Sequence, residues 1–237
     1  MQQVSINNLN LSFRTTEAYK TLRSNIEFSG SDMRTISVTS CMPNEGKSQV
    51  TFELARSFAQ NGNSVILIDA DLRKSVMREH YKSGRVTFGL SNYLVGQCEP
   101  DDATCETDEP GFYTIFSGPT TPTPSELLNS QRFENLLSFC RQMYDYTIID
   151  CPPIGSVIDG AIVGKQCDGT ILVISAGDIS YRFAQDVKGQ LDRADCHIIG
   201  CVLNKVPMES GKGYYGKYYG KYYGKYYGNY YGNESTH

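Results

Sequence analysis

Residues 35–50 read TISVTSCMPNEGKSQV, and this stretch decides the fold class. Its first six residues are typical of a buried strand, and from residue 46 to residue 60 apolar side chains recur on one face of a predicted helix. The loop between them ends in Gly46-Lys-Ser48, which is the strand–loop–helix context of a phosphate-binding P-loop. We therefore expect loop N–H groups to surround phosphates, Lys47 to reach the terminal phosphates and Ser48 to hold Mg²⁺.

The loop departs from the strict P-loop pattern at one position. Cys41 stands where that pattern has Gly, so this residue is expected to keep a negative φ and the loop to differ locally. Because Cys41 would lie near Lys47 at the N-terminus of a phosphate-binding helix, we expect a lowered thiol pKa; the alternative is a small buried residue. The residues of this segment expected to bind ATP are Pro43, Asn44, Glu45, Gly46, Lys47, Ser48 and Gln49.

Two further segments end predicted strands in carboxylates. Residues 65–73 read VILIDADLR, with Asp69 and Asp71 after an apolar run, and residues 147–153 read TIIDCPP, with Asp150 after another. In open α/β sheets the carboxyl ends of the strands line the ligand-binding crevice. Either segment alone is compatible with an ordinary solvated acid at a strand end. The three segments together predict one phosphate site.

The remaining apolar runs predict a parallel sheet, because they lack the polar alternation of strands that face water on one side. These runs are residues 65–68, 147–149, 170–174 and 198–203. Helical patterns at residues 127–143 and 183–191 lie between them, whereas residues 81–111 are expected to be irregular. We predict an α/β fold with a doubly wound, mostly parallel sheet of the P-loop NTPase type and helices on both faces.

Composition limits the class of protein. A chain of 237 residues suits one domain with appendages. There is no run of about 18 apolar residues and no leader with a cleavage site, so we expect neither a membrane span nor a secretion signal, and a cytoplasmic location. The eight cysteines show no CxxC spacing, which argues against a zinc site and a disulfide framework. Cys140, Cys196 and Cys201 lie in apolar stretches and are expected to be buried.

The C-terminal segment repeats a YYGK or YYGN unit from Gly211 onward. Residues 212–237 hold four Lys and one Glu, a formal charge of +3, which leaves 18 basic and 25 acidic side chains, or −7, for residues 1–211. The acidic body argues against broad nucleic-acid binding by the domain, although a tail that stacks on single strands is an alternative. The tail offers no apolar face, so we predict a flexible segment with a mean span of about 28 Å.

The predicted organisation has three parts. Residues 1–30 form an N-terminal extension, with a helix at residues 16–28 capped by Thr15 or Thr16. Residues 31–210 form the P-loop domain, and residues 211–237 form the tyrosine-rich tail. Its ten tyrosines are Tyr214, Tyr215, Tyr218, Tyr219, Tyr222, Tyr223, Tyr226, Tyr227, Tyr230 and Tyr231.

These motifs together resemble the bacterial tyrosine kinases of capsule and exopolysaccharide synthesis, in the form made as a separate cytoplasmic protein. The resemblance implies transfer of phosphate from ATP, with Mg²⁺, to tyrosines of the protein's own tail. The three segments then correspond to Walker A, Walker A′ and Walker B. Lys47 and Ser48 would bind phosphates and Mg²⁺, Asp71 and Asp150 would help to hold the metal, and either Asp69 or Asp71 would accept the tyrosine proton. Asn204, in Val202-Leu-Asn204-Lys, would contact adenine.

The same resemblance implies partners. A ring-shaped homo-oligomer would use a Glu-x-x-Arg-x-x-Arg helix, here Glu17, Lys20 and Arg23, in which Lys20 lacks the bidentate fork of the expected arginine. A transmembrane adaptor would recruit and activate the kinase at the inner face of the cell membrane, and a cognate tyrosine phosphatase would oppose it. The protein would thereby regulate polysaccharide synthesis and export, with no nucleic acid involved.

Two other classes of function fit parts of the sequence. A positioning ATPase of the partition or cell-division type would use water as acceptor, but such proteins carry a signature Lys early in the P-loop, where this chain has Met42. A scaffold without catalytic activity would use only the aromatic tail. The absence of the signature Lys favours the kinase.

Overall fold

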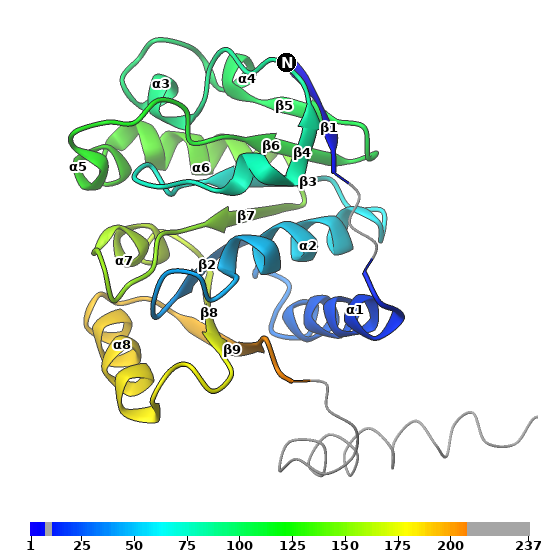
Figure 1. Cartoon of the computed structure of the whole chain (residues 1–237). Helices are drawn as coiled ribbons and strands as arrows, with labels where there is room; N and C mark the ends of the chain where they lie inside the picture. Colours follow the sequence, from blue (N-terminus) through cyan, green and yellow to red (C-terminus); the bar gives the residue numbers. More distant parts are fainter. Residues whose placement is uncertain (8–10, 208–237) are drawn as a thin grey trace, which may run out of the picture. The chain divides into compact units, whose positions relative to one another are not determined.

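A nine-stranded sheet forms the centre of the part of the protein that the computed structural model describes, residues 1–7 and 11–207 (Figure 1). The strand order is β4-β1-β5-β6-β3-β7-β2-β8-β9. The strands are β1 (Gln2–Ile6), β2 (Thr35–Ser40), β3 (Val65–Asp69), β4 (Tyr81–Ser83), β5 (Cys105–Thr107), β6 (Phe112–Ile115), β7 (Tyr146–Asp150), β8 (Gly169–Ser175) and β9 (Ile198–Asn204). The predicted tail and its ten tyrosines lie outside the described residues.

The sheet is mostly parallel, as predicted. Strands β6, β3, β7, β2, β8 and β9 pair in parallel throughout, and only the β1–β4 and β5–β6 pairs of the described sheet are antiparallel. The register sets Asp69 of β3 directly beside Asp150 of β7. Two of the predicted acidic segments therefore end at the same place on the same edge of the sheet.

Helices cover both faces of the sheet. They are α1 (Phe13–Glu27), α2 (Lys47–Ala59), α3 (Leu90–Leu94), α4 (Pro100–Ala103), α5 (Pro124–Leu128), α6 (Gln131–Met143), α7 (Asp159–Gly164) and α8 (Tyr181–Arg193), with a 3₁₀ turn at η1 (Met77–His80). Alternate residues of β3 pack on opposite faces of the sheet. Val65 and Leu67 belong to the hydrophobic cluster that includes α2, and Ile66 and Ile68 belong to the cluster that includes α6. Since both faces of the strand are buried, its apolar run has no polar alternation.

Helix α2 follows the P-loop, and more of its residues are buried than in any other described helix. Its residues Phe52, Leu54 and Phe58 are inaccessible to solvent. Phe52 stacks on the ring of His80 with centroids 4.7 Å apart and meets Tyr81 edge to face at 5.5 Å. Buried aromatic pairs of this kind fix the helix against the sheet, so its N-terminus is held in place at the end of β2.

Three predicted elements differ from the structure. Helix α1 begins earlier than expected, because Ser12 rather than Thr15 or Thr16 is its N-cap and accepts a hydrogen bond from the N–H of Thr15 at 3.2 Å. The helix predicted at residues 127–143 is two helices, α5 and α6, and Ser130 caps the second. The segment 81–111 is not irregular, since it contains β4, α3, α4 and β5.

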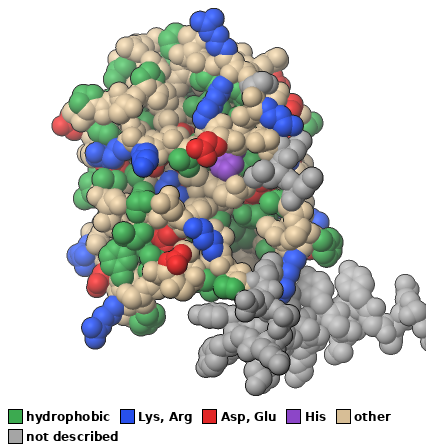
Figure 2. All heavy atoms as spheres, viewed as in Figure 1, with side chains coloured by type: hydrophobic (Ala, Val, Ile, Leu, Met, Phe, Trp, Pro, Cys, Tyr) green, Lys and Arg blue, Asp and Glu red, His purple; other side chains and the backbone are tan. Residues whose placement is uncertain are grey.

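Two expected burials are confirmed and one is wrong. Cys140 and Cys196 are buried, but Cys201 is exposed. The reason is its position on β9, which is an edge strand of the described sheet. On the face seen in Figure 2, Lys and Arg side chains are interspersed with Asp and Glu, so the negative charge of the domain forms no single acidic patch there. No helix among the described residues has the length and apolar character needed to cross a membrane.

Candidate active site

The P-loop between β2 and α2 has two residues in the left-handed region. Asn44 has φ +66° and Gly46 has φ +85°. A Cβ atom on Gly46 would lie 2.3 Å from the side-chain nitrogen of Asn204, so only glycine fits there. Helix α2 begins directly afterwards at Lys47 and points its free N–H groups at the loop. This arrangement is typical of a site for phosphate.

Two predicted ATP-binding residues hold the loop itself. The carboxylate of Glu45 accepts hydrogen bonds from the N–H of Met42 at 2.6 Å and from the N–H of Ser175 at 2.8 Å. The Nδ2 of Asn204 donates to the carbonyl of Glu45 at 2.9 Å. Glu45 therefore links the loop to β8, and Asn204 links it to β9. The side chain of Gln49, also predicted to bind ATP, donates to Glu53 one turn along α2 at 3.1 Å.

Lys47 lies at the meeting point of the three predicted segments. Its Nζ is 3.5 Å from Oδ2 of Asp71, 3.5 Å from Oδ2 of Asp150 and 3.1 Å from Oγ of Ser48. The lysine is 9% exposed, Asp71 5% and Asp150 1%. Residues from β2–α2, β3 and β7 thus form one buried cluster of charges.

Lys47 and the neighbouring carboxylates shift one another's pKa values. Burial lowers the pKa of Lys47, but the carboxylates of Asp150, Asp71 and Asp69 outweigh it and raise the pKa above the ordinary value. Burial raises the pKa of Asp150, and the opposing effect of Lys47 does not fully cancel it. The lysine is therefore a permanent cation at neutral pH, placed where the terminal phosphates of a nucleotide would lie.

Asp69 is enclosed more completely than Asp71. Its side chain is fully buried and accepts hydrogen bonds from Oγ of Ser75, from the N–H of Ser117 at 3.2 Å and from the N–H of Asp71 at 3.2 Å. Burial, with a contribution from Asp150, raises the pKa of Asp69 to about 7, although the hydrogen bonds from Ser75 and Ser117 oppose this. Asp69 thus titrates near neutral pH, which suits a general base.

The oxygen atoms of this cluster fit Mg²⁺ bound together with a nucleotide. Ser48, Asp71 and Asp150 supply a hydroxyl and two carboxylates beside Lys47. No group of three or more His, Cys, Asp or Glu side chains able to hold a metal occurs within residues 1–7 and 11–207. Mg²⁺ is commonly held by one or two carboxylates plus substrate phosphates, so the donors present match a metal that arrives with its nucleotide.

The predicted oligomerisation residues do not form one free surface. Glu17 and Lys20 are exposed and pair with each other at 2.7 Å along α1. Arg23 instead donates to the carbonyl of Ser57 on α2 at 2.8 Å and lies 3.6 Å from Glu27. Arg23 therefore fastens α1 to the domain, and only the first two side chains point away from it.

The expected lowering of the Cys41 thiol pKa is wrong. The residue is fully buried, and its burial, with smaller contributions from Glu45 and Cys201, raises the pKa of its thiol to about 12. Cys41 packs with Ile154 and Leu172 in an apolar cluster. Desolvation therefore outweighs the helix N-terminus, and the alternative of a small buried residue is correct.

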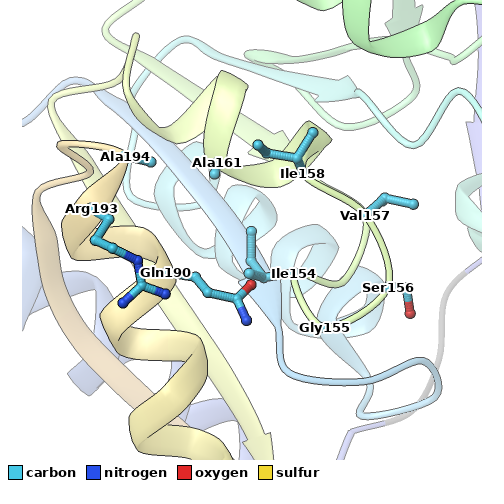
Figure 3. Close-up of a pocket in the computed structure, with 9 residues that line it drawn as sticks. All are labelled: Ile154, Gly155, Ser156, Val157, Ile158, Ala161, Gln190, Arg193 and Ala194. Atoms are coloured by element: carbon cyan, nitrogen blue, oxygen red, sulfur yellow. The ribbon is translucent and has the colours of Figure 1, made fainter.

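A cavity of about 500 Å³ lies beside the site, between α8 and the loop that leads into α7 (Figure 3). Ile154 and Ala161 contribute to its apolar wall, and Arg193 of α8 points across it. The same loop is bonded to the P-loop strand, since the N–H of Ile154 donates to the carbonyl of Ser40 at 2.9 Å and that of Gly155 to Cys41 at 3.0 Å. The cavity contains none of the predicted phosphate-site residues.

One ion pair near the site was not predicted. Arg73 of the VILIDADLR segment binds Asp159 at the start of α7, with Nε 2.6 Å from Oδ2 and Nη2 3.1 Å from Oδ1. Ser125 joins both side chains. Arg73 belongs to the VILIDADLR motif, but the sequence around Asp159 gives no indication that Asp159 is the partner of Arg73.

The protein is similar to known proteins over most of its length. Residues 33–182 match the family described as AAA domain. The chain is 40% identical over 193 residues to the tyrosine-protein kinase CpsD of Streptococcus agalactiae serotype III, an alignment that covers 81% of this chain and 83% of the relative. It is 38% identical over 205 residues to the tyrosine-protein kinase YwqD of Bacillus subtilis, covering 85% and 86%. The chain belongs to the family of bacterial tyrosine-protein kinases.

The solved structures agree with this assignment. The kinase domain of the Escherichia coli tyrosine kinase ETK superposes with a TM-score of 0.75 at 30% identity, and the match covers 84% of this chain and 80% of that domain. The predicted fold class, the predicted resemblance to capsule kinases and the predicted enzyme class are therefore confirmed. The protein is a tyrosine kinase built on a nucleotide-binding P-loop domain. The kinase assignment is therefore preferred to the alternative of a positioning ATPase as the main activity.

Proposed function

We propose that this kinase transfers the γ-phosphoryl group of ATP to the ten tyrosines of its own tail, and that this autophosphorylation regulates capsular or exopolysaccharide synthesis and export. The observation that supports the catalytic part is the contact of Lys47 with both Asp71 and Asp150, 3.5 Å each, at the N-terminus of α2. The sequence of the predicted tail, residues 211–237, sets tyrosines beside Gly and Lys, without an apolar pattern that could bury them.

The proposed roles follow from charge and position. Lys47 neutralises negative charge on the transferred phosphoryl group, and Ser48, Asp71 and Asp150 hold Mg²⁺, which supplies further charge neutralisation when it is bound. Asn44, Gly46 and the adjoining N–H groups surround the phosphates. Asp69 or Asp71 orients the tyrosine hydroxyl and accepts its proton. Asn204 contacts adenine from its place beside the loop.

The proposed partners remain those that the family resemblance implies. Glu17 and Lys20 would form contacts in a homo-oligomeric ring, and Arg23 would contribute by holding their helix on the domain. A transmembrane adaptor would bring the kinase to the inner face of the membrane, and a tyrosine phosphatase would reverse the reaction. The proposed setting is supported by the similarity to a putative tyrosine-protein kinase in the cps region of Klebsiella pneumoniae, 33% identical over 207 residues, which cover 84% of this chain and 28% of that relative.

Mapping the phosphate tests the proposed acceptor. Purified protein incubated with Mg-ATP is expected to carry phosphotyrosine in the segment 214–231, detected by mass spectrometry of a C-terminal peptide. A truncation before Tyr214 is expected to lose this label while still phosphorylating an added tail peptide. Label confined to tyrosines of residues 1–207 would rule out the tail as the acceptor.

The rate is expected to depend on pH through Asp69. A general base acts in its deprotonated form, so the rate should rise with pH through the pKa of Asp69, which is about 7 in the protein without nucleotide or metal. Asp69→Asn should remove this rise and lower kcat by about 10²- to 10⁴-fold. Turnover of a tail peptide at saturating ATP measures it, with Asp71→Asn in parallel. An Asp69→Asn protein that keeps the wild-type pH profile would assign the base to Asp71.

A further inference from the structure

Arg73 connects the Walker A′ loop to two helices. Its guanidinium forms a two-point contact with the carboxylate of Asp159 at 2.6 and 3.1 Å. Its Nη2 also donates to Oγ of Ser125 at 3.2 Å, and that hydroxyl donates to Oδ1 of Asp159 at 2.5 Å. Three elements distant in sequence, the loop after β3, the first turn of α5 and the first residue of α7, therefore meet in one network, which we call the Arg73 clamp.

The clamp is built around a buried charge. The side chain of Asp159 is inaccessible to solvent, whereas that of Arg73 is 41% exposed. Burial acts to raise the pKa of Asp159, but the hydrogen bonds from Arg73 and Ser125 outweigh it and the pKa is lowered. A buried carboxylate is held in its charged form only when it is paired and hydrogen-bonded. The planar fork of arginine provides the geometry for such a pair, which lysine lacks.

The residue that binds Asp159 through its side chain binds Asp71 through its backbone. The N–H of Arg73 lies 3.3 Å from Oδ1 of Asp71, and the N–H of Lys74 donates to the same oxygen at 2.9 Å. The other oxygen of Asp71 faces Lys47. The backbone of Arg73 thus helps to fix the orientation of the Asp71 carboxylate. Asp159 in turn fixes the side chain of Arg73.

The other end of the clamp leads back to the P-loop. Asp159 follows the loop after Walker B, in which the N–H of Ile154 donates to the carbonyl of Ser40 and Oγ1 of Thr39 donates to the carbonyl of Pro152 at 2.8 Å. These contacts tie that loop to the strand that carries the P-loop. Walker A, Walker B and Walker A′ are therefore connected to one another. The Arg73 clamp is the side-chain contact between Walker A′ and the loop after Walker B, in addition to the pairing of β3 with β7 and the hydrogen bond from the N–H of Ala70 to the carbonyl of Asp150 at 2.8 Å.

We infer that Arg73, Asp159 and Ser125 are positioning residues that hold the Asp71 carboxylate against Lys47 in the geometry needed for phosphoryl transfer. This inference rests on the proposed catalytic role of Asp71. The clamp acts on the reacting groups through Asp71. Phosphoryl transfer depends mainly on positioning and electrostatics, and a displacement of about 1 Å at a reacting group can lower the rate about 100-fold.

The test separates positioning from general support of the fold. Arg73→Gln and Asp159→Asn are each expected to lower kcat for an added tail peptide about 10- to 100-fold. Affinity for a fluorescent ATP analogue should change by less than about threefold, because the P-loop and Lys47 are unaltered. Arg73→Lys should not restore the rate, since its point charge cannot form the two-point contact. The double variant should be no slower than either single one, because both remove the same contact.

Controls make each outcome decisive. Arg141 forms an ion pair with Asp168 at 2.8 Å and is 42% exposed, so Arg141→Gln removes a matched arginine from the far end of the strands and should leave kcat unchanged. If Asp159→Asn does not fold, Ser125→Ala should show a smaller fall in kcat with an unchanged melting temperature. A folded Arg73→Gln protein with kcat within about twofold of wild type, or with kcat and ATP affinity lowered together, would overturn the inference. Asp71→Asn, assayed in parallel, should be inactive; an active Asp71→Asn protein would instead refute the proposed role of Asp71.

Discussion

Lys47→Met will lower the rate of phosphotyrosine formation by about 10³-fold or more. The lysine is the cation at the centre of the site, 3.5 Å from each of Asp71 and Asp150. Without it, the terminal phosphates of ATP would meet two carboxylates with no fixed protein charge to balance them. The effect should be mainly on the chemical step, because the negative charge of the transferred group must be stabilised there.

The same substitution will also lower the stability of the nucleotide-free domain. The sequence indicates only that Lys47 reaches phosphates, but in the structure its side chain is buried beside the carboxylates of Asp71 and Asp150. Removing one partner of a buried ion pair costs about 3–5 kcal/mol. For a protein of this size, such a loss lowers the melting temperature by roughly 10 °C.

The loss of stability should depend on pH. In the folded state the pKa of Asp69 is about 7 and that of Asp150 is also above its ordinary value of 3.8. An acid whose folded pKa is raised contributes stability below its unfolded pKa, and this contribution disappears as pH rises through the folded pKa. Removing Lys47 raises these values further, so the deficit of the variant should be larger at about pH 8 than at about pH 5.5.

Thermal melts and an anti-phosphotyrosine blot measure these effects. Lys165→Met is the matched control, because Lys165 is exposed and lies outside the site, and it should change neither the melting temperature nor the labelling. Labelling of the Lys47→Met protein at the wild-type rate would refute the site. Equal melting temperatures for wild type and variant at both pH values would show that the buried pair contributes nothing to stability.

The site was predictable from the sequence because its three parts obey one local rule. Each consists of an apolar run followed by polar or acidic residues, and in a parallel sheet the ends of such runs meet at one edge. The register of Asp69 beside Asp150 is the direct result. Sequence therefore identified Lys47, Asp71 and Asp150 as neighbours without any knowledge of strand order.

Other features had no such local signal. Arg73 and Asp159 are 86 residues apart, and their contact depends on how α5 and α7 pack at the edge of the sheet. The elements between residues 81 and 111 are only three to five residues long, which is too short for a helical or strand period to appear. Glu45 was predicted to bind ATP from its place in the P-loop, but a loop sequence does not reveal that β8 supplies an N–H for its carboxylate.

Cys41 shows how two physical effects compete at one residue. A helix N-terminus and a nearby lysine lower the pKa of a thiol, whereas burial raises it. The helix N-terminus and the lysine can be recognised in the sequence, but the burial cannot. Cys41 packs against Ile154 and Leu172, which are more than 100 positions away in the chain. The structure shows that burial is the larger effect here.

Transfer between molecules is the second large effect we expect. A Lys47→Met protein with its tail intact should become labelled when it is mixed with an active kinase truncated before Tyr214, although neither protein labels itself. The sequence predicts a flexible tail, and a chain of about 26 residues of that kind would have a mean span of about 28 Å, enough to reach the site of a neighbouring molecule. Each half of the mixture then supplies what the other lacks: one the catalytic cluster and the other the tyrosines.

The mixture should be studied below the lowered melting temperature of the Lys47→Met protein, with Asp71→Asn as a second inactive acceptor. Labelling should increase with the concentration of the truncated kinase, because the reaction is bimolecular, and should be lost when the acceptor is also truncated before Tyr214. The sequence has glycine at every fourth residue of the repeat, and glycine permits many backbone conformations, so we expect the label to spread over several of its tyrosines. If full-length active kinase labels itself under the same conditions while neither acceptor is labelled, transfer is confined to one molecule and each tail reaches only the site of its own chain.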